Sequence, residues 1–202
     1  MHTNTNNSKS RRRTSRSLLE EYAELHSTVN DMPRYLKQRR TWKMCHGRSV
    51  KTKLRCGTSE LEIETGRHER PIVPRSQRIC KCCTRAEVED SYHFVMQCPR
   101  FQPERRQMMS EIDNAINETR DFYGWRRMNA KRKWTFLLGD GPPVPDNPRA
   151  NLQWGRIETT LYHFLSRVYK ARRDFLKSWD SDRIPDVYRH NVRIAKRQGG
   201  VS

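Results

Sequence analysis

The sequence has few apolar residues and no long apolar run. Only 34% of its 202 residues are hydrophobic, and no stretch approaches the roughly 20 apolar residues that a membrane-spanning helix needs. The N-terminus, MHTNTNNSKSRRRTSRS, is polar and basic and lacks the apolar centre of a secretory signal. These absences predict a protein that has no membrane partner, is not secreted, and works in the reducing nucleus or cytoplasm.

Acidic residues are also scarce. The chain has 23 Asp and Glu against 41 Lys and Arg, which gives a formal net charge of +18. Such a charge attracts polyanions, and Lys and Arg that neutralise phosphates gain free energy by releasing counterions. Nucleic acid is therefore the leading partner. A basic scaffold that sits on RNA without selecting a sequence is the plainer alternative.

Most apolar residues recur at three- and four-residue steps, which predicts a mainly α-helical fold. Composition divides the chain into a disordered basic arm at 1–16, a helical region with a short extended segment at 17–76, a CCHC zinc-binding module at 77–106, a helical region with a long basic amphipathic helix at 107–179, and a basic tail at 180–202. Since so few apolar residues leave only a modest core, a structural metal would help to stabilise the fold.

Two residues are expected to mark helix ends. Gly47 is expected to end a helix that begins near Tyr35, because glycine commonly follows the last helical turn. Pro99 suits the first turn of an amphipathic helix that runs to about Thr119.

The stretch "SELEIETG" at 59–66 has a different period. Leu61 and Ile63 alternate with three glutamates, which predicts a short strand or extended segment. Because no nucleophile or histidine lies at a suitable distance, these glutamates are interpreted as a solvated face or as partners of the many arginines.

The stretch "RICKCCTRAEVEDSYHFVMQC" at 78–98 contains a candidate metal site. Cys80 and Cys83 are separated by two residues, and His93 and Cys98 by four, in the pattern C-x2-C-x9-H-x4-C. These spacings let one sulfur pair and one mixed pair converge on a tetrahedral Zn²⁺. Four protein ligands leave no position for a catalytic water, so the zinc is predicted to be structural. The alternative is a set of buried free cysteines.

Other cysteines fit a metal site less well. Only one residue would separate Cys82 from Cys80 if those two formed the pair, and none would separate it from Cys83. Neither spacing suits a pair of zinc ligands, so Cys82 is predicted not to be a ligand. A second site is disfavoured because the gaps between its candidate ligands are irregular; these are Cys45, His46, Cys56 and His68.

Cationic and aromatic residues near the metal ligands and on the long helix are the candidate nucleic-acid contacts. Arginine and lysine would hold phosphates, and an exposed aromatic ring could stack on an unpaired base. The predicted contacts are Arg78, Lys81, Arg85, Tyr92, Arg100, Arg167, Lys170, Arg172 and Arg173. Phe94 is expected to pack under the metal site instead. For the cations of the long helix, a solvated face over an ordinary core is the alternative.

The segments "LRCGTSELEIETGRHER" at 54–70 and "RICKCCTRAEVEDSYHFVMQCPRFQPERR" at 78–106 resemble the C-terminal zinc-binding region of non-LTR retrotransposon reverse transcriptases. The resemblance covers about residues 35–178 and is specific in the central fifty. It implies the same zinc ligands, Cys80, Cys83, His93 and Cys98. It also implies a region that follows a polymerase and holds template RNA or target DNA, so a retrotransposon polymerase chain is an implied partner.

The chain departs from that family in what it lacks. It has no Tyr-x-Asp-Asp-like polymerase motif and no glycine-rich phosphate loop, and Pro185-Asp186 has no nuclease partner motif after it. Because a basic arm follows Met1, the chain is expected to be a separate open reading frame. We expect a zinc-stabilised module for RNA or single-stranded DNA, without catalysis of its own and of open oligomeric state. The alternative is a zinc-stabilised protein-interaction or assembly subunit whose charge is incidental.

Overall fold

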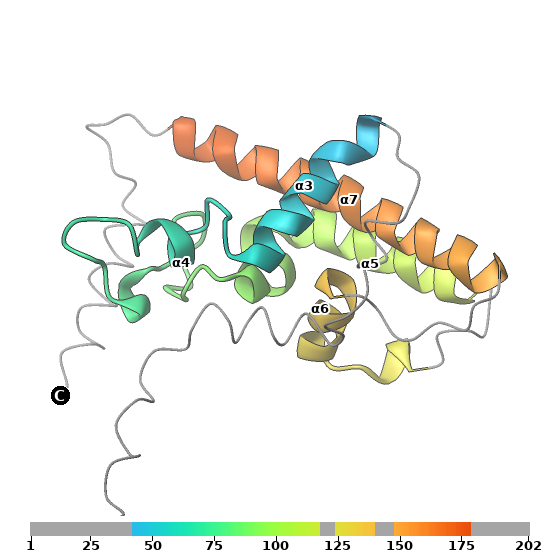
Figure 1. Cartoon of the computed structure of the whole chain (residues 1–202). Coiled ribbons are helices and arrows are strands. Elements are labelled where there is room, and N and C mark those ends of the chain that lie inside the picture. The colour runs from blue at the N-terminus through green and yellow to red at the C-terminus, as the bar shows by residue number, and fades with distance from the viewer. Residues whose placement is uncertain (1–41, 118–123, 140–147, 179–202) are drawn as a thin grey trace, which may run out of the picture.

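The computed structural model describes residues 42–117, 124–139 and 148–178 (Figure 1). The mainly helical class is confirmed, and the residues in these ranges contain no strand. The basic arm at 1–16 and all but the last four residues of the segment from Tyr35 to Cys45 lie outside the described residues, as does the tail at 180–202.

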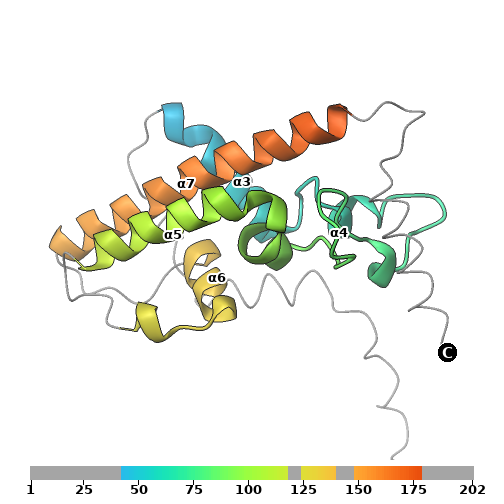
Figure 2. The ribbon, with the colours of Figure 1, turned by 180° about the vertical axis from the view of Figure 1, so that it is seen from behind.

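The helix α7 (Pro148–Lys177) is the element against which α3 and α5 pack. Helix α3 (Trp42–Cys56) crosses it, and α5 (Gln102–Asn117) runs beside it (Figures 1 and 2). The shorter α6 (Ala130–Leu138) contacts α3 and the turn His93–Gln97. The remaining elements are single turns: α4 (Glu62–Thr65), η1 (Arg75–Gln77), η2 (His93–Gln97), η3 (Pro99–Phe101) and η5 (Trp125–Arg127).

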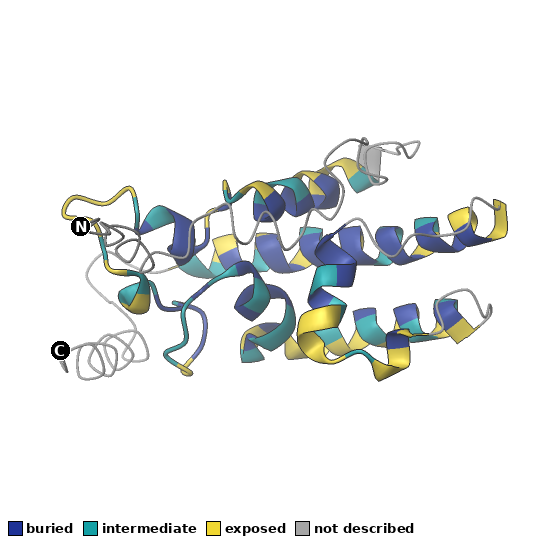
Figure 3. Cartoon of the chain, turned by 60° about the horizontal axis from the view of Figure 1, so that its bottom comes forward, coloured by how far each residue is buried: buried dark blue, intermediate teal, exposed yellow. Residues whose placement is uncertain are grey.

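The core lies where these helices face one another. Most apolar side chains of α7 recur at helical spacing and are buried, among them Ile157, Leu161, Leu165 and Val168. Figure 3 shows buried residues on the facing sides of the helices and exposed residues on their outer sides. Such an apolar stripe is what docks a surface helix onto a core.

Gly47 does not end a helix, so that expectation is wrong. It lies inside α3, where the helix makes its closest approach to α7. A Cβ at this position would be 2.1 Å from the carbonyl oxygen of Tyr162. The glycine is therefore needed for the approach of two backbones, and its helix-ending tendency is overridden by packing.

Helix α3 is also tied to its neighbours by buried cations. Lys51 Nζ lies 3.0 Å from a carboxylate oxygen of Glu158 on α7, and both side chains are buried. Arg55 is buried as well, and its Nη1 donates a 2.8 Å hydrogen bond to the carbonyl of Leu138 at the end of α6. A cation at a helix C-terminus satisfies a carbonyl that has no partner in its own helix.

The segment expected to be a strand is the one-turn helix α4. Its alternation does not separate an inner from an outer face, because Leu61 and Ile63 are buried together with Glu62 and Glu64. The glutamates pair with cations as expected: Glu62 with Lys81 at 2.9 Å and Glu64 with Arg67 at 2.8 Å. Ion pairing allows both carboxylates to be buried beside the apolar side chains. The alternation of apolar and acidic residues therefore does not indicate a strand in this segment.

We predict that Gly47→Ala destabilises the protein, although alanine is the better helix former by about 1 kcal/mol. The added methyl group forces α3 away from α7, at a cost of roughly 2 kcal/mol or more in the free energy of unfolding. Gly124→Ala is the matched control, because its Cβ would meet only Met128 at an ordinary 3.6 Å. Thermal and urea unfolding measure both variants, and equal stability of the two would contradict the close crossing.

Candidate metal centre

A hairpin positions the first two candidate ligands. Ile79 and Val88 form an isolated antiparallel bridge, and the Cys80 N–H donates a 2.9 Å hydrogen bond to the carbonyl of Glu87. The chain reverses through Ala86, which has a positive φ of 54°. The Cys82 N–H lies 3.4 Å from Cys80 Sγ and donates to it. The loop from Cys80 to Cys83 is thus wrapped around a sulfur atom.

A wide helical turn positions the other two candidate ligands. The Asp90 carboxylate accepts a 2.7 Å hydrogen bond from the His93 N–H and so caps the turn. The turn η2 is a π-helix, in which the Cys98 N–H donates to the carbonyl of His93 at 2.7 Å. Because a π-turn joins residues five apart, the spacing H-x4-C brings His93 and Cys98 to one side.

The two elements bring four buried side chains together. The ligand atoms of Cys80, Cys83, His93 and Cys98 all lie within 4.8 Å of one another. Cys80 Sγ is 4.0 Å from Cys98 Sγ, and Cys83 Sγ is 3.5 Å from His93 Nε2. These are the four residues that the spacing selected, and together they could hold a metal ion.

Hydrogen bonds within the cluster shift the pKa values of its thiols in opposite directions. Those from Cys80 and Cys98 hold the pKa of the Cys83 thiol far below its usual value, whereas those with Cys82 and Cys83 raise the pKa of Cys80. Burial opposes a charged His93, but its hydrogen bonds with Cys83 and Cys98 outweigh burial and raise its pKa to about 10. His93 Nδ1 lies 2.9 Å from a carboxylate oxygen of Glu87, which directs Nε2 toward the thiols. This arrangement of carboxylate, imidazole and thiols is typical of metal sites.

The remaining cysteines are arranged differently. Cys82 is buried and forms a second close group with Cys80 and Glu89, but that carboxylate is already paired with an arginine. Cys45, Cys56 and His68 are exposed and join no cluster among the residues that the structure describes. His46 instead lies 2.8 Å from Ser166 Oγ.

One buried carboxylate ties the hairpin to the helices. Arg172 of α7 donates two hydrogen bonds to Glu89, from Nε at 2.8 Å and from Nη2 at 2.7 Å. The Glu62 N–H donates to the same carboxylate at 2.9 Å, and Cys80 Sγ lies 3.6 Å from it. Glu89 is 0% exposed and Arg172 only 2%. The expectation that Arg172 contacts nucleic acid is therefore wrong, because its guanidinium is occupied inside the protein.

Three other predicted contacts have structural partners. Arg78 is half-buried and donates to the carbonyls of Val73 at 2.8 Å and Ile63 at 2.9 Å. Lys81 pairs with Glu62. Tyr92 is half-buried and packs edge-on against Trp134, with ring centroids 5.9 Å apart. Phe94 is buried, as expected.

The exposed members of the predicted set lie in separate places. Arg85 lines a groove beside the candidate metal centre, whereas Arg167 and Lys170 line a smaller hollow between α5 and α7. The guanidinium carbon of Arg100 lies 3.7 Å from the centre of the Phe175 ring. Arg173 is 3.9 Å from Glu60. Arg85 thus lines a different hollow from Arg167 and Lys170.

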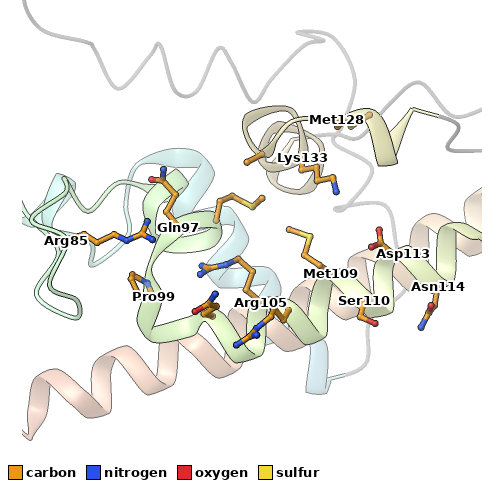
Figure 4. Close-up of a pocket in the computed structure, with 14 residues that line it drawn as sticks. Arg85, Gln97, Pro99, Arg105, Met109, Ser110, Asp113, Asn114, Met128 and Lys133 are labelled. Atoms are coloured by element: carbon orange, nitrogen blue, oxygen red, sulfur yellow. The ribbon is translucent and has the colours of Figure 1, made fainter.

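The groove of about 930 Å³ lies between the hairpin loop, η2, α5 and α6 (Figure 4). The basic and sulfur-containing residues that line it are Arg85, Arg105, Arg106, Lys133, Met96, Met109 and Met128. Except for Arg85, these side chains were not predicted as contacts. A signal was present in the sequence, because residues 124–139 hold five Lys and Arg and no acid.

Comparisons with models of protein families, with curated proteins and with solved structures find no match for this chain. Among the described helices, none is long and apolar enough to span a bilayer.

We predict that Arg172→Leu costs roughly 3 to 5 kcal/mol in the free energy of unfolding, because it leaves the Glu89 carboxylate buried without a cation. Arg173→Leu is the matched control, since its side chain is 46% exposed and its loss should change stability by about 0.5 kcal/mol or less. Urea unfolding of both variants measures the difference. Similar midpoints would show that the buried pair does not hold the hairpin to α7.

We predict that Cys83→Ser abolishes metal binding and that Cys82→Ser leaves it intact. The two thiols are neighbours, but only Cys83 belongs to the cluster of four. Elemental analysis of the purified variants measures the metal bound per chain. Equal loss in both variants would mean that the ligand set is wrong.

Proposed function

We propose that this chain is a zinc-stabilised module that binds RNA or single-stranded DNA and that has no catalysis of its own. One observation carries the proposal: the loops that hold the candidate metal ligands also form one wall of a cationic groove. In this interpretation the metal has a structural role, and the shape that it maintains is the binding surface.

The donor set and its dimensions support zinc. Three thiolates and one imidazole are typical ligands of structural Zn²⁺. With Zn–S bonds of about 2.3 Å and a Zn–N bond of about 2.05 Å, a tetrahedral site needs roughly 3.8 Å between two sulfurs and roughly 3.5 Å between sulfur and nitrogen. The corresponding separations here are 4.0 Å and 3.5 Å. Cys80, Cys83, His93 and Cys98 would fill all four positions, so no water would be activated.

The distribution of charge supports a polyanionic partner. Lys51 is buried with Glu158, and Arg172 is buried with Glu89. Each buried pair is neutral, so neither changes the net charge of the remaining residues. The net charge of +18 is therefore left to the rest of the chain. Phosphates would replace the counterions of these cations, which makes salt-dependent binding the expected behaviour.

We also propose that the module derives from the C-terminal end of a non-LTR retrotransposon reverse transcriptase. Three consecutive positions of the motif that carries the resemblance have a structural role. Val88 pairs with Ile79, Glu89 binds Arg172, and Asp90 caps the turn that presents His93. A sequence that preserves these positions preserves the architecture of the site. In the cell, the polymerase of such an element is the protein partner that this origin favours.

The test is the affinity of the full chain for fluorescent single-stranded RNA and DNA over a salt series, with and without a chelator. We predict binding at low salt that weakens steeply as salt increases, and loss of both fold and binding after chelation. No binding at low salt would refute the nucleic-acid function and favour a protein-interaction or assembly role. Unchanged fold and binding after chelation would refute the role of the metal.

A further inference from the structure

We propose that the single-stranded nucleic acid lies in the groove between the hairpin loop, α5 and α6, with phosphates on its cations and bases on its methionines. This inference rests on the proposed function and assigns it to one face of the molecule. The cations are Arg85, Arg106 and Lys133, and the methionines are Met96, Met109 and Met128.

The groove has walls from different parts of the fold. Figure 4 shows Arg105, Met109 and Asp113 along α5, with Lys133 and Met128 across from them and Arg85 at the hairpin loop. Arg105 is a positioning residue, because it donates to the carbonyls of Cys98 at 2.8 Å and Val95 at 3.4 Å. It thereby fixes α5 to the turn that carries two candidate ligands.

The metal centre forms the other side of the groove. Arg85 follows Cys83 by two residues, and Gln97 and Pro99 flank Cys98. A change in the positions of these ligands would move the wall of the groove. Binding in this groove therefore depends on the metal without any contact to the metal itself.

The electrostatics of the groove favour an anion. Four cations, Arg85, Arg105, Arg106 and Lys133, line the same groove, so their charges repel one another. Lys133 Nζ lies 4.7 Å from the centre of the Trp125 ring, a contact that orients the lysine and leaves its charge in place. The one acid in the lining, Asp113, accepts a 2.6 Å hydrogen bond from Trp125 Nε1. A phosphate between the cations would relieve their repulsion.

The start of α6 extends the positive region. Arg126, Arg127, Lys131 and Arg132 are exposed, and Figure 3 shows this stretch as part of the outer surface. The first turn of α6 contains no acid, and the dipole of the helix adds partial positive charge at this end. A strand that leaves the groove would therefore continue over a cationic surface.

The methionines indicate a single strand rather than a duplex. All three are half-buried, and their flexible, polarisable side chains adapt to flat apolar surfaces of varied shape. A duplex hides the faces of its bases, whereas a single strand can turn them toward an apolar floor. The cations of the groove would contact the phosphate of an unpaired nucleotide, and the methionines would contact its base.

The exposed row on α7 is a weaker candidate and a useful control. Arg167 and Lys170 line a hollow of about 520 Å³ that also contains Glu111. Arg167 is held by Gln107 at 3.3 Å, and no half-buried methionine lines that hollow. Together with Arg156, which is exposed on the same helix, Arg167 and Lys170 supply three cations, as many as the groove variant removes, but no half-buried methionine lies beside them in the hollow.

The experiment compares two triple variants of the full chain, each of which lowers the net charge by three. The groove variant is Arg85→Gln, Arg106→Gln and Lys133→Gln; the control is Arg156→Gln, Arg167→Gln and Lys170→Gln. For a fluorescent single strand, the groove variant should lose roughly tenfold or more in affinity, and the slope of log K against log salt should shrink by about 2. The control should keep both values. Metal content and circular dichroism verify that each variant is folded.

The outcomes separate the inference from the function on which it rests. Equal losses of affinity in both variants, or a larger loss in the control, would refute binding in the groove. The proposal that the chain binds nucleic acid would still stand. A wild-type chain that does not bind would overturn both. Met109→Ser tests the floor, since it should weaken single-strand binding without changing the salt slope. Equal affinity of the wild type for a duplex and a single strand would overturn the base contacts.

Discussion

The structure depends on the buried ion pair between Glu89 and Arg172. A carboxylate that is 0% exposed is tolerated only with a cation and further hydrogen bonds, and here it receives two from Arg172 and one from the Glu62 N–H. These groups come from the hairpin, from α7 and from α4, so one carboxylate fixes three elements. Cys80 Sγ lies against the same carboxylate. The position of the candidate metal centre is thus set by the long helix as well as by its own loops.

This arrangement makes the centre part of the helical core. Phe94, next to the candidate ligand His93, packs edge-on against Phe101 and Tyr169, with centroids 5.4 Å and 6.0 Å away. The carbonyl of the candidate ligand Cys98 accepts a hydrogen bond from Arg105 of α5. A metal in this position would stabilise the packing of α5 and α7 as well as the loops, because its ligands are joined to both. The proposed binding groove depends on the same connections, since its walls are α5, α6 and the ligand loops.

What could be predicted from the sequence was local. Helical periodicity identified the class of fold, and ligand spacing identified the four side chains that converge, because both depend on residues close in the chain. Gly47 and the 59–66 segment were misinterpreted because a helix crossing and a distant carboxylate decide their conformation. Arg172 was misinterpreted because its partner lies 83 residues away, and an amphipathic helix can bury a cation that meets an acid. The groove combines residues from three regions, so only the fold brings them together.

The central claim is that one zinc ion, held by three thiolates and one imidazole, maintains the shape of this module. X-ray absorption at the zinc edge of the purified protein tests it most directly. The account predicts three sulfur ligands at about 2.3 Å and one nitrogen ligand at about 2.0 to 2.1 Å, with no water. A shell of four sulfurs would place Cys82 at the metal, and an oxygen ligand would mean an open site. Either result, or a protein that contains no zinc, would contradict the account.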